Sequence, residues 1–155
     1  MRAVLQRVKR ASVQIEGRIH SRIGLGQLIL LGVEKIDGPE AAELLARKAY
    51  DLRIFEDPAG KMNLAAQEVG GSFLVVSQFT LAASLRGRRP SFDSAAPPQQ
   101  AIPLYELFVN ALRACGAEVQ TGVFGARMEI ELINDGPVTL ILETPDDGRR
   151  DAVDR

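Results

Sequence analysis

The residues GQLILLGV at positions 26–33 form a continuous apolar run, and this run limits the folds open to the chain. It is too short to span a membrane and suits a strand that is covered on both of its faces. Helical spacing of apolar residues follows from about Asp37 to Leu52 and again from about Gln99 to Ala114. Strand-like segments precede, separate and follow these helices. This order predicts a mixed α/β fold with largely antiparallel sheets and helices packed on an outer face.

The other strand-like segments are short and are separated by turn residues. Ala11, Val13 and Ile15 alternate with polar residues, which is the period of a half-buried strand. His20 follows in a turn-like stretch, and residues 80–98, rich in Ser, Arg, Gly and Pro, are predicted to form a long loop. The strands are predicted at residues 2–9, 11–16, 53–57, 61–65, 72–78, 118–124, 128–134 and 138–143.

The chain has 155 residues, a length that favours one domain with a sizeable core. We predict a single domain over residues 1–144 and a charged, disordered tail over residues 145–155. The first residues lack the apolar core of a signal peptide, and the single cysteine, Cys115, excludes an internal disulfide. We therefore expect a cytoplasmic protein with no membrane association, in which Cys115 is a buried or half-buried apolar residue.

The net charge of −1 gives the chain no overall positive field that would attract nucleic acid. Any such contact must come from local patches of basic residues. One patch is predicted near the N-terminus and another in the segment LRGRRP; they contain Arg2, Arg7, Lys9 and Arg10, and Arg86, Arg88 and Arg89. From charge alone, a solvated strand face and a solvated loop are the simpler interpretation.

The side chains that enzymes commonly use for catalysis are missing from the sequence. His20 is the only histidine and is expected on the surface, and no nucleophile-elbow motif accompanies a serine. There is no Walker motif, no dinucleotide fingerprint and no carboxylate cluster at metal spacing, so we expect neither metal nor cofactor. Any catalysis must depend on backbone groups or on groups that the substrate brings.

Three short segments carry a possible function. In SQFTL, residues 77–81, a strand ends in a loop, and free N–H groups of Phe79 and Thr80 are the donors that an acyl-transfer oxyanion needs. The arginines of GRRPSF, residues 87–92, are able to contact phosphates. NDGPVT, residues 134–139, places a donor-less proline at the start of an apolar run. Taken singly, the three segments are more simply interpreted as a strand end, a basic loop and a turn, respectively.

Taken together and in order, these segments closely resemble the D-aminoacyl-tRNA deacylase (D-tyrosyl-tRNA deacylase) family. The resemblance runs from Met1 to about Glu143 and also includes MRAVLQRV, LLGVE, LRIFED followed by GKMNL, and TGVFGARM. The loop AASLRGRRPSF is one residue shorter than the family pattern and lacks its lysine, which affects the loop contacts. The family fold is an α/β structure with a barrel-like core of largely antiparallel strands and helices outside.

The resemblance implies an enzyme that hydrolyses the ester of D-aminoacyl-tRNA, and of mischarged glycyl-tRNA, in proofreading of translation. It also implies a homodimer in which a cis Gly-Pro pair of one subunit enters the active site of the other and rejects L-amino acids. Backbone donors hold the oxyanion, and the 2′-hydroxyl of the tRNA assists catalysis. The catalytic segment is then Ser77, Gln78, Phe79 and Thr80, and the substrate-binding residues are Gly136, Pro137, Arg7, Phe124 and Met128.

Two other classes of function remain open from the residues themselves. A non-catalytic RNA-end binder would use the two basic patches but has no need of SQFTL or the Gly-Pro pair. An esterase with a serine nucleophile, such as Ser77, would react with a covalent serine probe.

Overall fold

Strand β3 (Gly26–Gly32) lies inside a six-stranded sheet, and nearly all of it is buried, as its apolar sequence predicts. The structure is a computed structural model and describes residues 1–144. The strand order is β2-β1-β3-β6-β7, with β8 on β1. All pairings of β1 are antiparallel, whereas β3 pairs with β6 (Ser72–Ser77), and β6 with β7 (Val119–Thr121), in parallel. The mixed α/β fold is therefore confirmed.

Strand β1 (Arg2–Ile15) is one long strand, so the prediction of two separate strands is wrong. It pairs with β3 through its first half, with β2 (Arg18–Ile23) through its second half and with β8 along its length. The register with β8 shifts beside the exposed Lys9, where an extra residue bulges without ending the strand. The strand thus changes the face that it buries while it keeps its partners.

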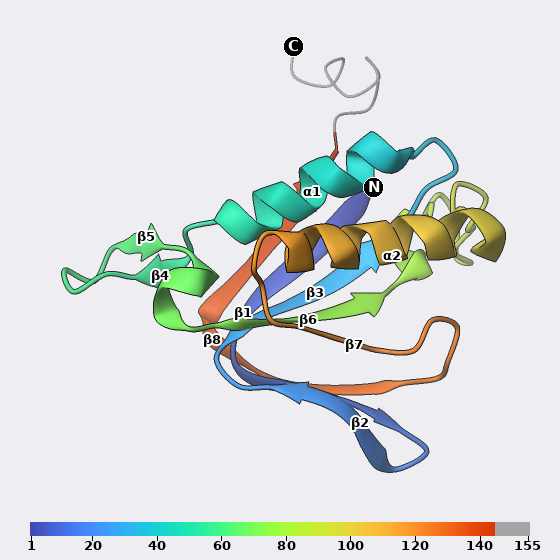
Figure 1. The fold of residues 1–155 in the computed structure, drawn as a ribbon. Coiled ribbons are helices and arrows are strands. Elements are labelled where there is room, and N and C mark those ends of the chain that lie inside the picture. Colours follow the sequence, from blue (N-terminus) through green and yellow to red (C-terminus); the bar gives the residue numbers. More distant parts are fainter. Residues whose placement is uncertain (145–155) are drawn as a thin grey trace.

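This change of face allows β1 to serve two apolar clusters. Ala3 and Leu5 pack in a first cluster with residues of both long helices, whereas Val8, Ala11 and Val13 pack in a second cluster. Strict alternation would send Val8 and Ala11 to opposite faces, and the bulge between them removes that conflict. The sheet curls around the second cluster until β2 contacts β7 (Figure 1), which gives the predicted barrel-like core.

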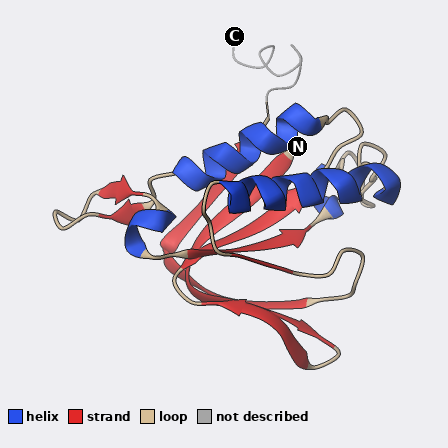
Figure 2. Ribbon diagram, in the orientation of Figure 1, coloured by secondary structure: helices blue, strands red, loops and turns tan. Residues whose placement is uncertain are grey.

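The two long helices lie side by side on one face of the sheet (Figure 2), as predicted. Helix α1 spans Pro39–Asp51 and helix α2 spans Pro98–Ala114, which places their ends within two residues of the predicted ones. The apolar stripe of α2 is buried at Tyr105, Phe108, Val109 and Leu112. Gly38 occupies the N-cap position of α1, and the carboxylate of the preceding Asp37 accepts from the N–H of Glu34.

Several local expectations need correction. His20 is exposed, as expected, but it lies in β2 and not in a turn. Cys115 is exposed where α2 ends, because the apolar stripe of the helix stops at Leu112. The predicted loop of residues 80–98 contains most of a one-turn 3-10 helix, η2 (Phe79–Ala82), and a bridge between Ser84 and Ser91.

The remaining elements are short, apart from the last strand. Strands β4 (Phe55–Glu56) and β5 (Met62–Leu64) lie within the strands predicted at 53–57 and 61–65 and form an antiparallel pair, and η1 (Ala66–Val69) leads into β6. Strand β8 (Glu129–Glu143) runs through both of the last predicted strands. The predicted tail at 145–155 lies outside the described residues, and among the described helices none is long and apolar enough to cross a membrane.

A close backbone approach between β3 and β6 provides a test of this packing. Gly26 faces Ser72, and a Cβ built on Gly26 would lie 1.8 Å from the Ser72 carbonyl oxygen. We expect Gly26→Ala to lower the free energy of unfolding by about 1–3 kcal/mol or more, because β3 and β6 must separate. The matched control is Gly24→Ala, where a Cβ meets no atom within 4 Å. Urea denaturation measures both, and equal midpoints for the two variants would contradict the packing.

Candidate active site

The segment SQFTL leaves the sheet where β6 ends. Ser77 is the last residue of the strand, and the N–H of Gln78 makes one further bond, 2.8 Å to the carbonyl of Leu31 on β3. Gln78 then turns the chain with φ −141° and ψ 82°, and η2 begins at Phe79. Sheet pairing therefore stops at the point where the sequence predicts free backbone donors.

The N–H groups of Phe79 and Thr80 have no hydrogen-bond acceptor among the described residues. The next N–H groups are bonded, with Leu81 N–H donating to the Gln78 carbonyl at 3.2 Å and Ala83 N–H to the Thr80 carbonyl at 3.1 Å. Phe79 and Thr80 are both exposed residues, so solvent reaches this turn of the chain. Two adjacent N–H donors of this kind suit a developing oxyanion.

The side chains of this segment contribute packing and a local hydrogen bond. The ring of Phe79 is 55% exposed and meets Phe92 edge to face, with 5.1 Å between the ring centroids. The Gln78 side-chain amide donates to the Thr80 hydroxyl at 2.5 Å. Within residues 1–144, no hydrogen bond joins the Ser77 hydroxyl to His20 or to a carboxylate, so no base for a serine nucleophile is in place.

The segment NDGPVT is a bulge in β8, not the end of a strand. Gln6 on β1 pairs with Thr139, and Val8 pairs with Asn134, so residues 135–138 of β8 lie opposite Arg7 alone. Gly136 and Pro137 are exposed within this bulge, and the peptide bond between them is cis. The prediction of two strands joined by a turn is therefore wrong, because pairing with β1 resumes in antiparallel register beyond the bulge.

Asn134 closes the bulge with its side chain. Its carbonyl oxygen accepts from the N–H of Val138 at 2.7 Å, and its amide donates to the Val138 carbonyl at 3.1 Å and to the Thr139 hydroxyl at 3.0 Å. Sequence reasoning treated Asn134 only as a turn residue. The tendency of Asn side chains to hydrogen-bond nearby backbone groups, in place of a partner on the neighbouring strand, was the signal that could have indicated this role.

Arg7 holds the bulge from its place opposite it on β1. Its guanidinium is buried and donates to the carbonyl of Asp135 at 2.8 Å and to the carbonyl of Ile54 at 2.6 Å. The carboxylates of Asp135 and Glu56 lie 3.7 Å and 4.0 Å away and balance its charge. Arg7 therefore joins β1, the approach to β4 and the bulge, and it does not belong to a surface patch of basic residues.

Gly136 has no room for a side chain. Its φ is +148°, and a Cβ would lie 2.7 Å from Cγ2 and 2.8 Å from the backbone nitrogen of Val138. Val138 is buried in the first apolar cluster and cannot easily withdraw. The shape of the bulge thus depends on glycine at this position.

The two motifs of one chain do not meet. Ser77 is level with Leu31, whose partner on β1 is Ala3, whereas the bulge is level with Arg7. Four residues of strand separate these levels, which is about 14 Å along the sheet, and β1 and β3 lie between β8 and β6. The two motifs of one chain therefore do not form a single compact site.

Phe124 and Met128 lie on the connection from β7 to β8. Phe124 is half-buried, meets Tyr105 edge to face at 6.1 Å and lines a pocket of ≈ 370 Å³ with Thr121 and Gly122. Met128 packs against the second apolar cluster, and its sulfur lies 2.7 Å from a Cβ built on Gly122, so it supports the pocket without lining it.

The polar end of Tyr105 closes the floor of this pocket. Its hydroxyl donates to the carbonyl of Val75 on β6 at 2.8 Å. Burial raises the pKa of Tyr105 to about 12, although the charge of Arg113 opposes the shift, so the hydroxyl remains a neutral donor at physiological pH.

The remaining predicted site residues are exposed. Arg86, Arg88 and Arg89 lie in the loop beyond η2, and no ion pair holds them within the part of the chain that the structure describes. Residues 1–144 contain no group of three or more His, Cys, Asp or Glu side chains placed to hold a metal ion.

Comparisons with known proteins cover almost the whole chain. The family model described as D-Tyr-tRNA(Tyr) deacylase matches residues 4–143. A protein of Geotalea uraniireducens named D-aminoacyl-tRNA deacylase is 55% identical and aligns over 97% of each chain. One of Anaeromyxobacter dehalogenans with the same name is 57% identical over 93% of this chain and 97% of its own. The solved structure titled c-Myc DNA Unwinding Element Binding Protein has a TM-score of 0.90 and 42% identity, and covers 94% of this chain and 100% of its own.

The family match spans nearly all of the described chain, and identities above half extend over almost the whole length of the relatives. Both findings agree with the resemblance that the sequence motifs carry. The chain therefore belongs to the D-Tyr-tRNA(Tyr) deacylase family, and the predicted class of enzyme, a hydrolase that acts on ester bonds, is confirmed.

Proposed function

We propose that the protein hydrolyses the ester between a D-amino acid and the terminal adenosine of tRNA, and also cleaves mischarged glycyl-tRNA. The observation that carries this proposal is the pair of unbonded N–H groups at Phe79 and Thr80, exposed where β6 ends. In this proposal they bind the oxyanion that forms when water attacks the ester carbonyl. Each donor of this kind lowers the barrier by about 2.7–4 kcal/mol.

Ser77, Gln78, Phe79 and Thr80 form the catalytic segment in this proposal, but their backbone performs the chemistry. Among residues 1–144 no His or carboxylate is hydrogen-bonded to the Ser77 hydroxyl, and the Thr80 hydroxyl accepts from the Gln78 side chain. In line with the family resemblance, the proposal assigns activation of the attacking water to the 2′-hydroxyl of the terminal ribose. Phe124 receives the terminal adenine on its ring, in the pocket that Met128 supports from behind.

Selectivity for the D form comes from Gly136 and Pro137 of a second subunit. Their carbonyls lie in an exposed bulge that Arg7 and Asn134 hold in one shape, so they are able to accept from the substrate ammonium. The same backbone leaves no space for the side chain of an L-amino acid. Glycine has no side chain to exclude, which makes glycyl-tRNA a substrate.

The proposal requires a homodimer, because the bulge and the catalytic segment of one chain lie apart in the sheet. The edge of β8 is suited to such an interface, since the apolar residues Leu140 and Ile141 beside the bulge are 38% and 65% exposed. Release of free tRNA from wrongly charged molecules is a proofreading step of translation, and we place it in the cytoplasm.

The first prediction of this proposal concerns the homodimer. Light scattering at micromolar concentration should give twice the chain mass of 16.8 kDa, because each active site needs the bulge of the other subunit. Dilution into the monomer range should abolish activity. A monomer with full activity would rule out the shared site.

The second prediction separates backbone from side-chain chemistry. Thr80→Ala and Ser77→Ala should each keep activity within about tenfold of the wild type, because both leave the N–H donors of Phe79 and Thr80 in place. Single-turnover deacylation of D-aminoacyl-tRNA measures the rates. A loss near 10⁴-fold in either variant, or labelling of Ser77 by a covalent serine probe, would indicate a side-chain nucleophile instead.

The third prediction concerns selection by exclusion at the bulge. Gly136→Ala should lower deacylation of D-aminoacyl-tRNA by about 100-fold or more, because the new methyl group displaces the bulge from Val138. The dimer and the fold should persist, as measured by light scattering and circular dichroism. Gly24→Ala, in open space, is the control with unchanged activity.

The same assay with the wild type should compare matched D-aminoacyl-, L-aminoacyl- and glycyl-tRNA. We expect hydrolysis of the D-aminoacyl and glycyl substrates, and survival of the L-aminoacyl substrate even at high enzyme concentration. Similar rates on the D and L substrates would show that the bulge does not exclude L-aminoacyl groups, whatever the effect of Gly136→Ala.

A further inference from the structure

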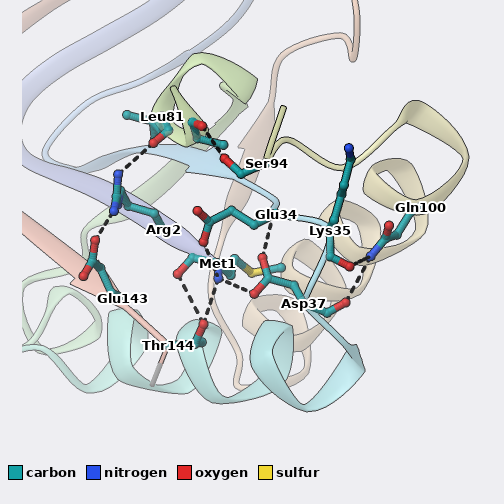
Figure 3. Close-up of polar contacts among 11 residues, drawn as sticks. Met1, Arg2, Glu34, Lys35, Asp37, Leu81, Ser94, Gln100, Glu143 and Thr144 are labelled. Carbon is teal, nitrogen blue, oxygen red and sulfur yellow. Dashed lines mark hydrogen bonds and ion pairs between the residues drawn. The ribbon is translucent and has the colours of Figure 1, made fainter. Parts of the chain in front are cut away.

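The C-terminal half of η2 is held by two side chains from distant parts of the chain. The Arg2 guanidinium donates to the carbonyl of Leu81 at 2.8 Å, and the Ser94 hydroxyl donates to the carbonyl of Ala82 at 2.6 Å. Figure 3 shows both contacts on the same short helix. These carbonyls are at the end of η2 opposite to the free N–H groups of Phe79 and Thr80.

Arg2 is itself fixed in the sheet. It lies in β1 between its partners Gly32 and Glu143, and its Nε forms an ion pair with the Glu143 carboxylate on β8. Beside it, a Cβ on Gly32 would lie 2.9 Å from the Cβ of Leu81. The side chain of Arg2 therefore reaches η2 where the helix is in closest contact with the end of β3.

Ser94 is fixed to the same end of β3 by backbone bonds. Its carbonyl accepts from the N–H of Lys35 at 2.9 Å, and the N–H of Ala96 donates to the Val33 carbonyl at 3.0 Å. The loop that follows β3 is attached in turn to the N-terminal ammonium of Met1, which is bonded to Asp37 (Figure 3). The Arg2 and Ser94 side chains that bond to η2 thus both come from segments that are hydrogen-bonded to the end of β3 or to the loop that follows it.

A single turn of 3-10 helix has little stability of its own, because nucleating a turn orders several residues for one or two hydrogen bonds. Its orientation must come from contacts with the rest of the protein. Within the part of the chain that the structure describes, Arg2 and Ser94 donate the side-chain hydrogen bonds to the carbonyls of η2, and the backbone N–H of Gln78 bonds to Leu31 just before the helix. The Phe79 ring also meets Phe92, and Ala82 is buried. A shift of about 1 Å in catalytic groups is enough to lower a rate about 100-fold.

We propose that Arg2 and Ser94 are positioning residues that hold η2 so that the N–H groups of Phe79 and Thr80 point at the ester carbonyl. Neither residue touches the substrate. The inference rests on the proposed oxyanion role of these two N–H groups, and adds the residues that orient them.

The experiment compares Arg2→Gln, Arg2→Lys and Ser94→Ala with the wild-type dimer. Arg10→Gln is the matched control, because Arg10 is an exposed arginine of the same strand whose ion pair with Glu131 is far from η2. Amide hydrogen exchange of Leu81 and Ala83 reports on η2, since both N–H groups are bonded within that turn. Steady-state deacylation of D-aminoacyl-tRNA gives kcat and KM separately.

We expect faster exchange at Leu81 and Ala83 in Arg2→Gln and Ser94→Ala, with kcat lowered about 10- to 100-fold and KM within about threefold of the wild type. Arg2→Lys should recover part of kcat, because an ammonium is still able to donate to the Leu81 carbonyl. Arg10→Gln should change neither exchange nor kcat.

Two results would overturn the inference, and they differ in what they imply. Unchanged exchange in both Arg2→Gln and Ser94→Ala would show that these side chains do not hold η2, and would leave the oxyanion role of Phe79 and Thr80 untouched. Faster exchange with unchanged kcat would show that η2 is held by them but does not carry the oxyanion donors, which would also reject that part of the proposed function.

Discussion

The whole structure depends on one strand that changes the face it buries. Strand β1 pairs with β2, β3 and β8, and it contributes Leu5 to the cluster under the helices but Val8 and Val13 to the cluster inside the curled sheet. A regular strand would commit one set of alternating residues to one face throughout. The bulge beside Lys9 relaxes this constraint, so the same sheet supports two helices with one part and closes on itself with the other.

Arg7 lies just before this change of face and connects it to the candidate site. Its guanidinium is buried, but it donates to the carbonyls of Asp135 and Ile54, and nearby carboxylates balance its charge. Loss of one partner of a buried charge is far more costly than a surface ion pair, at about 3–5 kcal/mol. A buried arginine that bonds to two backbone carbonyls therefore supports the exposed Gly-Pro bulge and keeps this solvent-facing segment in a fixed shape.

Sequence periodicity was sufficient for the elements that bury an apolar face. It located α1, α2 and β3 and the free donors where β6 ends, because burial at regular spacing leaves a direct signal. It failed where the backbone departs from regular pairing. The bulges at Lys9 and at residues 135–138 looked like strand ends, since long-range pairing with β1 and β8 is what keeps each strand continuous.

The site was predictable only in part, for a related reason. The segments at 77–80 and 134–139 stood out by composition and by their joint resemblance to a family, whereas the roles of Arg2, Ser94 and Asn134 arise from contacts between residues that no local pattern links. Arg2 and Leu81, for instance, meet only because η2 packs on the end of β3.

The bulge at residues 135–138 has a wider consequence, because β8 pairs with β1 on both sides of it and the two ends of the bulge are already fixed by the sheet. A substitution confined to the bulge would therefore alter the local shape of residues 135–138 without shifting the register of β8 on β1.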